Sequence, residues 1–188
     1  MSITGYTCGD LFGQQILLEE AEMGLMQILN NTRQLDIISI VGMPVVVNST
    51  VINAAVVIQK GKVLGVAAKT YLPNYKEFYE QRWFTSALQL TEDTVRLCGQ
   101  IVPIGANLLF ETSDTTFGIE NLRRPLGYHT CPVPHWLYKE QKLFSICLPI
   151  MKESESIIIF VLLSVNNQHV ALQDTYFLPV VSGSPLRM

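Results

Sequence analysis

The sequence predicts a mixed α/β fold over residues 1–120, followed by an irregular tail over residues 121–188. Two patterns lead to this prediction: an amphipathic helical segment near the start of the chain, and several β-rich segments that follow it. The chain has 188 residues, of which 48% are hydrophobic, and this suffices for one domain with a buried core. We therefore expect a single α/β unit in the first part.

The first predicted element is an amphipathic helix from Asp10 to about Asn31. Apolar residues recur in this segment at helical spacing, and Glu19, Glu20 and Glu22 would form its solvent-exposed face. Asp is a residue type that caps helix N-termini with its side-chain oxygen. We therefore expect the helix to begin at Asp10.

The segments that follow predict β-strands. Residues 36–42 are apolar almost throughout, as in a strand that is covered on both faces, and Pro44 marks the predicted end of this strand. A polar turn at residues 59–62, which contains Gly61, predicts a hairpin between two further strands. The strands predicted after the first are residues 51–58, 63–67, 103–111 and 115–120.

Composition and charge exclude several classes of function. The formal net charge is −3 and no basic stripe carries interleaved aromatic residues, so nucleic acid is not an expected partner. The most apolar run, Ile157–Leu163, is far shorter than the roughly 20 residues of a membrane-spanning helix. No signal-peptide pattern opens the chain, and the cysteines lack CxxC spacing. We expect a cytoplasmic protein without a zinc site or disulfide scaffold, in which Cys8 and Cys98 are inert.

A long loop is predicted from Thr70 to about Thr85, and loops of this length inside a domain are usually functional. Residues 66–75, which lead into it, read Val-Ala-Ala-Lys-Thr-Tyr-Leu-Pro-Asn-Tyr. This segment resembles the lysine loop of the nitrilase superfamily of carbon–nitrogen hydrolases, in the form carried by the glutaminase domain of glutamine-dependent NAD synthetases. Residues 2–12 resemble the stretch that follows the catalytic Glu of these enzymes. The resemblance covers residues 1–120 and implies the first half of an α-β-β-α sandwich.

The resemblance also implies a chemistry. In this family a Cys thiolate attacks the carboxamide of glutamine, a Glu is the general base, and a Lys stabilises the oxyanion. Lys69 matches the catalytic lysine, and Tyr75 and Tyr6 match tyrosines at the glutamine pocket. Glu80 and Arg82 match charged positions after the lysine loop, and we interpret them as a structural ion pair. The glutaminase domain implies no cofactor; ATP and deamido-NAD would bind only in a separate synthetase domain.

Two residues of the family's site are not found where the resemblance places them. The Glu is expected immediately before Met1, so we expect an N-terminally truncated fragment. The nucleophile is expected directly after Gly118-Ile119-Glu120, where the sequence instead reads Asn-Leu-Arg-Arg-Pro-Leu-Gly over residues 121–127. Codons that encode these residues can spell Ile-Cys-Glu-Asp-Leu-Trp, the family's nucleophile segment, when they are read one base later. Further family segments can be recovered in the same way from residues 132–187. We therefore interpret residues 121–188 as an out-of-frame tail without a native fold, produced by a frameshift at Asn121 and a second near Gly127.

The expected function is that of a fragment of a glutamine amidohydrolase domain, which hydrolyses glutamine to supply ammonia for NAD biosynthesis. We expect this chain to be inactive, because it lacks the nucleophile. Two alternatives remain open. A complete, active synthetase could arise after frame correction or ribosomal frameshifting, or the fragment could be a non-catalytic module that docks on an intact homologue, since nitrilase domains form homo-oligomers.

Overall fold

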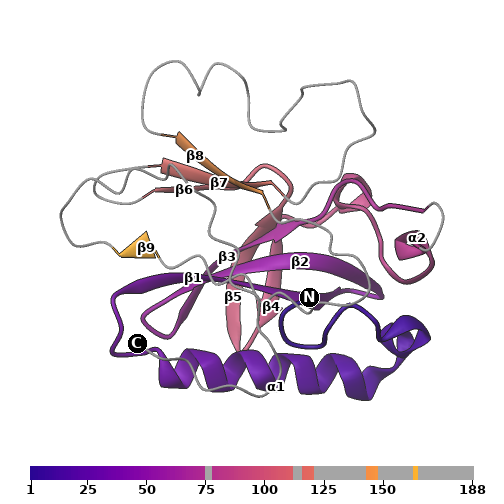
Figure 1. Ribbon diagram of the computed structural model, residues 1–188, viewed down its shortest axis with the longest axis horizontal. Helices are drawn as coiled ribbons and strands as arrows, with labels where there is room; N and C mark the ends of the chain where they lie inside the picture. The colour runs from indigo at the N-terminus through magenta and orange to yellow at the C-terminus, as the bar shows by residue number, and fades with distance from the viewer. Residues whose placement is uncertain (75–77, 112–115, 121–142, 148–162, 165–188) are drawn as a thin grey trace, which may run out of the picture.

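The computed structural model describes residues 1–74, 78–111, 116–120, 143–147 and 163–164. The described chain forms three layers (Figure 1): helix α1 (Gln15–Asn31), a six-stranded sheet of order β4-β5-β3-β2-β1-β9, and a three-stranded sheet of order β6-β7-β8. Helix α1 covers one face of the larger sheet, and the smaller sheet covers the other face. These layers confirm the α/β class and match the first half of the predicted sandwich.

The predicted N-terminal helix begins later than expected. A 3-10 turn, η1 (Gly9–Gly13), comes first, and α1 begins after Gln14, whose backbone is extended with φ −91° and ψ 125°. The predicted N-cap role of Asp10 is therefore wrong. Its carboxylate instead accepts hydrogen bonds from the side chains of Arg82 and Trp83.

Strands β1 (Ile37–Val47), β2 (Thr50–Gln59) and β3 (Lys62–Ala68) form an antiparallel meander. The predicted hairpin between β2 and β3 is confirmed, with positive φ at Lys60 and Gly61 as its two-residue turn requires. The predicted strand end at Pro44 is wrong, because β1 continues to Val47. Proline is tolerated there because the described residues place a strand against the outer edge of β1 at Ile37 and Ile38 alone.

The remaining elements frame this meander. The bounds are β4 (Thr94–Leu97), β5 (Gln100–Gly105), β6 (Leu109–Glu111), β7 (Thr116–Glu120), β8 (Leu143–Cys147), β9 (Leu163–Ser164), α2 (Glu80–Trp83) and η2 (Ala87–Gln89). The strand predicted at 103–111 is thus two strands in different sheets. Of the predicted tail, β8 pairs in parallel with β7 and β9 pairs with β1; its other residues lie outside the described ranges.

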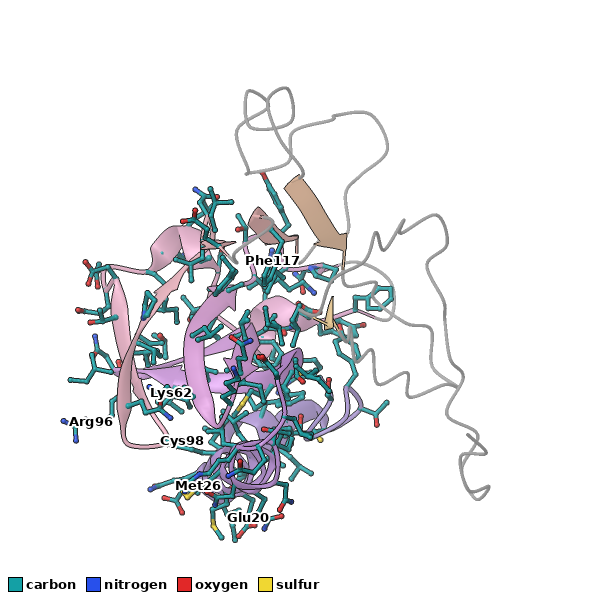
Figure 2. All side chains as sticks on the ribbon, turned by 90° about the vertical axis from the view of Figure 1, so that its left-hand side faces the viewer. Glu20, Met26, Lys62, Arg96, Cys98 and Phe117 are labelled. Atoms are coloured by element: carbon teal, nitrogen blue, oxygen red, sulfur yellow. The ribbon has the colours of Figure 1, made fainter. Side chains whose placement is uncertain are left out.

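Strand β2 is buried on both faces because it separates two apolar cores. Its even-numbered residues, such as Val56, pack in the core under α1, whereas Ala55 and Val57 pack with Phe117 and Ile119 of the second sheet. Figure 2 shows Phe117 at the level of the smaller sheet, far from Met26 and Glu20 on the helix. The alternation of side chains along a strand thus places the odd-numbered β2 residues on the face opposite α1.

Among the described residues, no helix has both the length and the apolar character of a membrane-spanning segment.

Candidate active site

The predicted functional loop leaves the sheet at Lys69 and returns to it beside the same residue. The Lys69 N–H donates to the carbonyl oxygen of Asn53 over 2.9 Å, which extends the pairing of β3 with β2 by one bond. The Ala87 N–H donates to the Lys69 carbonyl over 2.9 Å, and the Ser86 hydroxyl donates to the Thr70 carbonyl over 2.5 Å. The backbone of Lys69 is therefore held on both sides at the neck of the loop.

Inside the loop, Lys69 forms a buried ion pair with Glu80. The Lys69 Nζ lies 2.7 Å from Glu80 Oε1, and the two side chains are 3% and 0% exposed. Glu80 begins the single turn of α2, and its N–H donates to the Pro73 carbonyl over 3.1 Å. Burial of either charge alone would be very costly, so each residue depends on the other.

Two further donors satisfy the Glu80 carboxylate. The Tyr6 hydroxyl donates to Oε1 over 2.8 Å, and Nδ2 of Asn53 donates to Oε2 over 3.4 Å. Tyr6 therefore lies in the same site as Lys69, whereas Tyr75, the other tyrosine matched to the glutamine pocket, lies outside the described residues. Sequence reasoning missed Asn53, although a polar residue within an otherwise apolar strand is a usable signal.

The predicted ion pair between Glu80 and Arg82 is wrong. Residues two apart on a helix point to different sides, so Glu80 faces inward while Arg82 reaches outward to Asp10. Arg82 Nε lies 2.6 Å from Asp10 Oδ1, and Trp83 Nε1 donates to the same oxygen over 2.9 Å. The hydrogen bond from Arg82, and then that from Trp83, holds the pKa of Asp10 below its usual value.

The aromatic ring of Phe12 joins the same two segments from the inside. Phe12 is buried, and its ring centroid lies 4.9 Å from that of Phe84 and 6.0 Å from that of Trp83. The segment that carries Tyr6 is therefore anchored to the loop that carries Glu80 by both a polar and an apolar contact.

Electrostatics in the site act on Lys69 in two directions. Burial lowers the pKa of Lys69 below its ordinary value, because the charged form loses water, and the neighbouring Glu80 carboxylate opposes this change. The site thus holds the Lys69 ammonium group away from water, and the Glu80 carboxylate fixes its orientation. Such a group is a preorganised hydrogen-bond donor for a developing negative charge.

The main chain at Met1 and Ser2 packs against Gly42 of β1. The Ser2 N–H donates to the Gly42 carbonyl over 2.5 Å, and Gly42 N–H donates to the Ser2 hydroxyl over 3.2 Å. A Cβ atom at Gly42 would lie 3.0 Å from the Met1 nitrogen, so a larger residue there would require the N-terminal main chain to shift slightly. Burial, and then the charge of Lys69, lowers the pKa of the Met1 amino group, while the charge of Glu80 opposes this change.

The cysteines with described side chains are engaged elsewhere. Cys8 Sγ donates to the Thr4 carbonyl over 3.0 Å, and Cys98 Sγ donates to the Glu22 carbonyl of α1 over 3.6 Å. Burial, and then the charge of Glu22, raises the pKa of Cys98 to about 11. Figure 2 shows Cys98 on the helix side of the molecule. The side chains of Cys131 and Cys147 are outside the described part.

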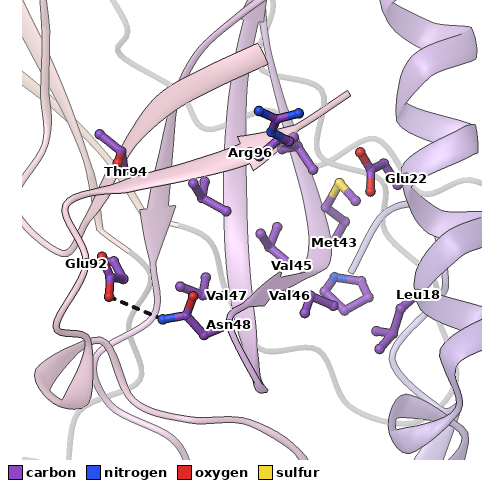
Figure 3. A pocket seen from close by; sticks show the side chains of 13 residues that line it. Leu18, Glu22, Met43, Val45, Val46, Val47, Asn48, Glu92, Thr94 and Arg96 are labelled. Atoms are coloured by element: carbon purple, nitrogen blue, oxygen red, sulfur yellow. Dashed lines mark hydrogen bonds between the residues drawn. The ribbon is translucent and has the colours of Figure 1, made fainter. Parts of the chain in front are cut away.

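A cavity of about 370 Å³ lies away from this site, between α1, β1 and β4 (Figure 3). Its lining includes Leu18, Glu22, Val46 and Arg96, and a hydrogen bond of 3.2 Å from Asn48 Nδ2 to Glu92 Oε1 crosses one side of it. Neither Lys69 nor Glu80 lines it. The buried ion pair, which is the candidate site, is therefore separate from this cavity.

The layers of the described chain match a partial α/β domain of the nitrilase type. Comparisons with known proteins name a particular enzyme. Over 114 residues, 61% of this chain, the sequence is 37% identical to the glutamine-dependent NAD(+) synthetase of Mycobacterium bovis, and over 84 residues it is 42% identical to that of Aquifex aeolicus. The N-terminal part of the chain is therefore homologous to glutamine-dependent NAD(+) synthetases.

A solved structure agrees with the sequence comparison. The crystal structure of a glutamine-dependent NAD(+) synthetase from Cytophaga hutchinsonii superposes with a TM-score of 0.59 and 26% identity over 78% of this chain. The chain spans only 17% and 15% of the two curated relatives and 23% of the crystallised chain. No protein-family model matches the sequence.

The buried ion pair makes a prediction about stability. Lys69→Met leaves Glu80 buried without its cation, and we expect the free energy of unfolding to fall by about 3–5 kcal/mol. The matched control is Lys60→Met, because Lys60 pairs with Asp36 over 3.0 Å with side chains 57% and 50% exposed; this change should cost no more than about 1 kcal/mol. Urea unfolding of the three proteins measures both effects. Equal losses in the two variants would contradict a buried, mutually dependent pair.

The raised pKa of Cys98 predicts slow alkylation. At a given pH a higher pKa means less thiolate, and thiolate is the reacting form. With a pKa of about 11, Cys98 in the folded chain should react with iodoacetamide at pH 8 roughly a hundredfold more slowly than an ordinary thiol. The rate should rise about tenfold per pH unit until that pKa. The same residue in urea-unfolded protein is the control, and mass spectrometry of the Cys98 peptide gives the rates. A fast reaction at pH 8 in the folded state would contradict the assignment.

Proposed function

We propose that residues 1–120 are part of a glutamine-hydrolysing domain and that they contribute the oxyanion-stabilising half of its site. The observation that carries this proposal is the buried ion pair of Lys69 and Glu80. When a thiolate attacks a carboxamide, negative charge develops on the carbonyl oxygen. The Lys69 ammonium, removed from water and held by Glu80, is suited to stabilise that charge.

We propose further that this chain does not itself hydrolyse glutamine. The reaction needs a thiolate beside the lysine, and residues 121–127, where the family's nucleophile is expected, contain no cysteine. The thiols of Cys8 and Cys98 donate hydrogen bonds to the backbone carbonyls of Thr4 and Glu22. A frameshift would account for the missing cysteine, because the codons of Leu122 and Arg123, read one base later, can encode the family's Cys.

The resemblance supports a place for the general base. It puts a Glu immediately before Met1, whose main chain packs against Gly42 of β1. A carboxylate on a preceding residue would thus complete a site with Lys69, as a base for the nucleophile. In this proposal Tyr6 and Tyr75 contact the glutamine substrate.

The other parts of the proposal concern the whole protein. Ammonia released from glutamine would serve NAD biosynthesis in the cytoplasm, and ATP and deamido-NAD would bind a synthetase domain that is separate from residues 1–120. The proteins with which this chain shares sequence are named for glutamine dependence and NAD synthesis, which supports glutamine as the substrate. Docking of this chain on an intact homologue, in a homo-oligomer, is the non-catalytic alternative.

A glutaminase assay on two proteins tests the proposal. The 188-residue chain should release no glutamate from glutamine above background. The frame-corrected product of the same gene, with its codons before Met1 included, should release glutamate, and Lys69→Ala should abolish this activity. Glutaminase activity in the uncorrected chain that is lost on Lys69→Ala would refute the proposed inactivity. An inactive but folded frame-corrected protein would refute the proposed function.

A further inference from the structure

Asn53 contacts both members of the buried ion pair. Its carbonyl oxygen accepts the N–H of Lys69 over 2.9 Å, and its side-chain amide donates to Oε2 of Glu80 over 3.4 Å. We propose that Asn53 is a positioning residue of the proposed amide-hydrolysis site, which holds the Glu80 carboxylate in the orientation that directs the Lys69 ammonium. The consequence for catalysis rests on the proposed function, but the positioning itself does not.

The place of Asn53 on β2 makes this double contact possible. The pair Ala54↔Ala68 is the end of the regular β2–β3 ladder, so the next residue of each strand, Asn53 and Lys69, stand opposite each other. Side chains alternate along a strand, and Ile52 and Ala54 face the core under α1. Asn53 therefore faces the other side, where its side chain is buried with 7% exposure.

Chemistry determines which end of the Asn53 amide faces Glu80. An ionised carboxylate can only accept hydrogen bonds, so the NH₂ group of the amide must point to Oε2. The other oxygen, Oε1, is already shared by Lys69 at 2.7 Å and Tyr6 at 2.8 Å. With one oxygen held by Asn53 and the other by these two donors, the carboxylate plane cannot rotate without breaking a contact to a charged, buried group.

A purely structural role for Asn53 predicts different behaviour from a positioning role. If the residue only fills space, an apolar side chain of similar size should serve equally well at a buried strand position. If it positions Glu80, the loss of the amide frees Oε2, and Lys69 should leave its buried position more often. Lys69 then becomes more reactive towards reagents in water, while the rest of the domain stays closed.

The test is acetylation of the full chain with limiting acetic anhydride, followed by mass spectrometry of each lysine. In Asn53→Leu, acetylation of Lys69 relative to exposed Lys60 should rise about tenfold, as expected for the loss of one hydrogen bond to a charged group. The matched control is Ser39→Ala, since Ser39 is a buried polar residue of the neighbouring strand with 6% exposure. It should leave the ratio unchanged.

A second probe separates local release of Lys69 from general unfolding. Cys98 lies on the α1 side of the larger sheet, and its alkylation reports opening of that core. We expect Cys98 alkylation in Asn53→Leu to equal that of the unsubstituted chain. An unchanged Lys69 ratio, or a Lys69 increase matched by an equal Cys98 increase, would overturn the positioning role. Neither result depends on glutaminase activity, so failure of this inference is distinct from failure of the proposed function.

Discussion

The described site depends on one interaction, the ion pair that buries Lys69 and Glu80 together. Isolated charges of this kind are unstable away from water, whereas a pair at 2.7 Å with further hydrogen bonds can be accommodated. Lys69 directly follows strand β3, and Glu80 begins the single helical turn α2 in the loop after it. The ion pair therefore attaches the loop to the sheet, in addition to the backbone hydrogen bonds that Lys69 makes with Asn53 and Ala87.

The layers of the fold explain why this pair can be buried. Strand β2 is covered on one face by the core under α1 and on the other by residues of the second sheet. The loop after β3 then continues along the edge of β2, where Lys69 bonds to Asn53 and the Thr85 N–H donates to Val51 over 2.8 Å. The N-terminal segment closes the site from another side through Tyr6, and Phe12 anchors this segment to Phe84. Segments from three parts of the sequence thus surround one carboxylate.

Sequence patterns predicted the elements that depend on local spacing. The hairpin at Lys60 and Gly61 followed from turn chemistry, and the helix before it followed from its apolar stripe. Errors arose where a tertiary contact outweighed a local rule. Asp10 was a good N-cap by residue type, but Arg82 and Trp83 offer its carboxylate three hydrogen bonds from a distant loop. Pro44 was a plausible strand end, but an edge position tolerates it.

The resemblance of residues 66–75 to the family's lysine loop directed attention to Lys69, whose catalytic role stays a prediction. The structure places Tyr6 and Lys69 beside the same carboxylate, that of Glu80. The partner of Lys69 was not predicted, because Glu80 lies eleven positions away in a loop whose path cannot be derived from periodicity. Asn53 was missed because its importance depends on the register between β2 and β3, which alternation alone does not determine. The predicted tail and Tyr75 remain predictions.

An NMR titration of Lys69 in the full chain, with isotope-labelled lysine and assignment by Lys69→Arg, tests the buried ion pair most directly. Lys69 should titrate below the ordinary lysine pKa of about 10.4, because burial disfavours its charged form. Glu80→Gln should lower the pKa of Lys69 further, because the carboxylate favours the ammonium. Titration of Lys69 at the ordinary value, unaffected by Glu80→Gln, would show an exposed lysine and contradict the buried ion pair.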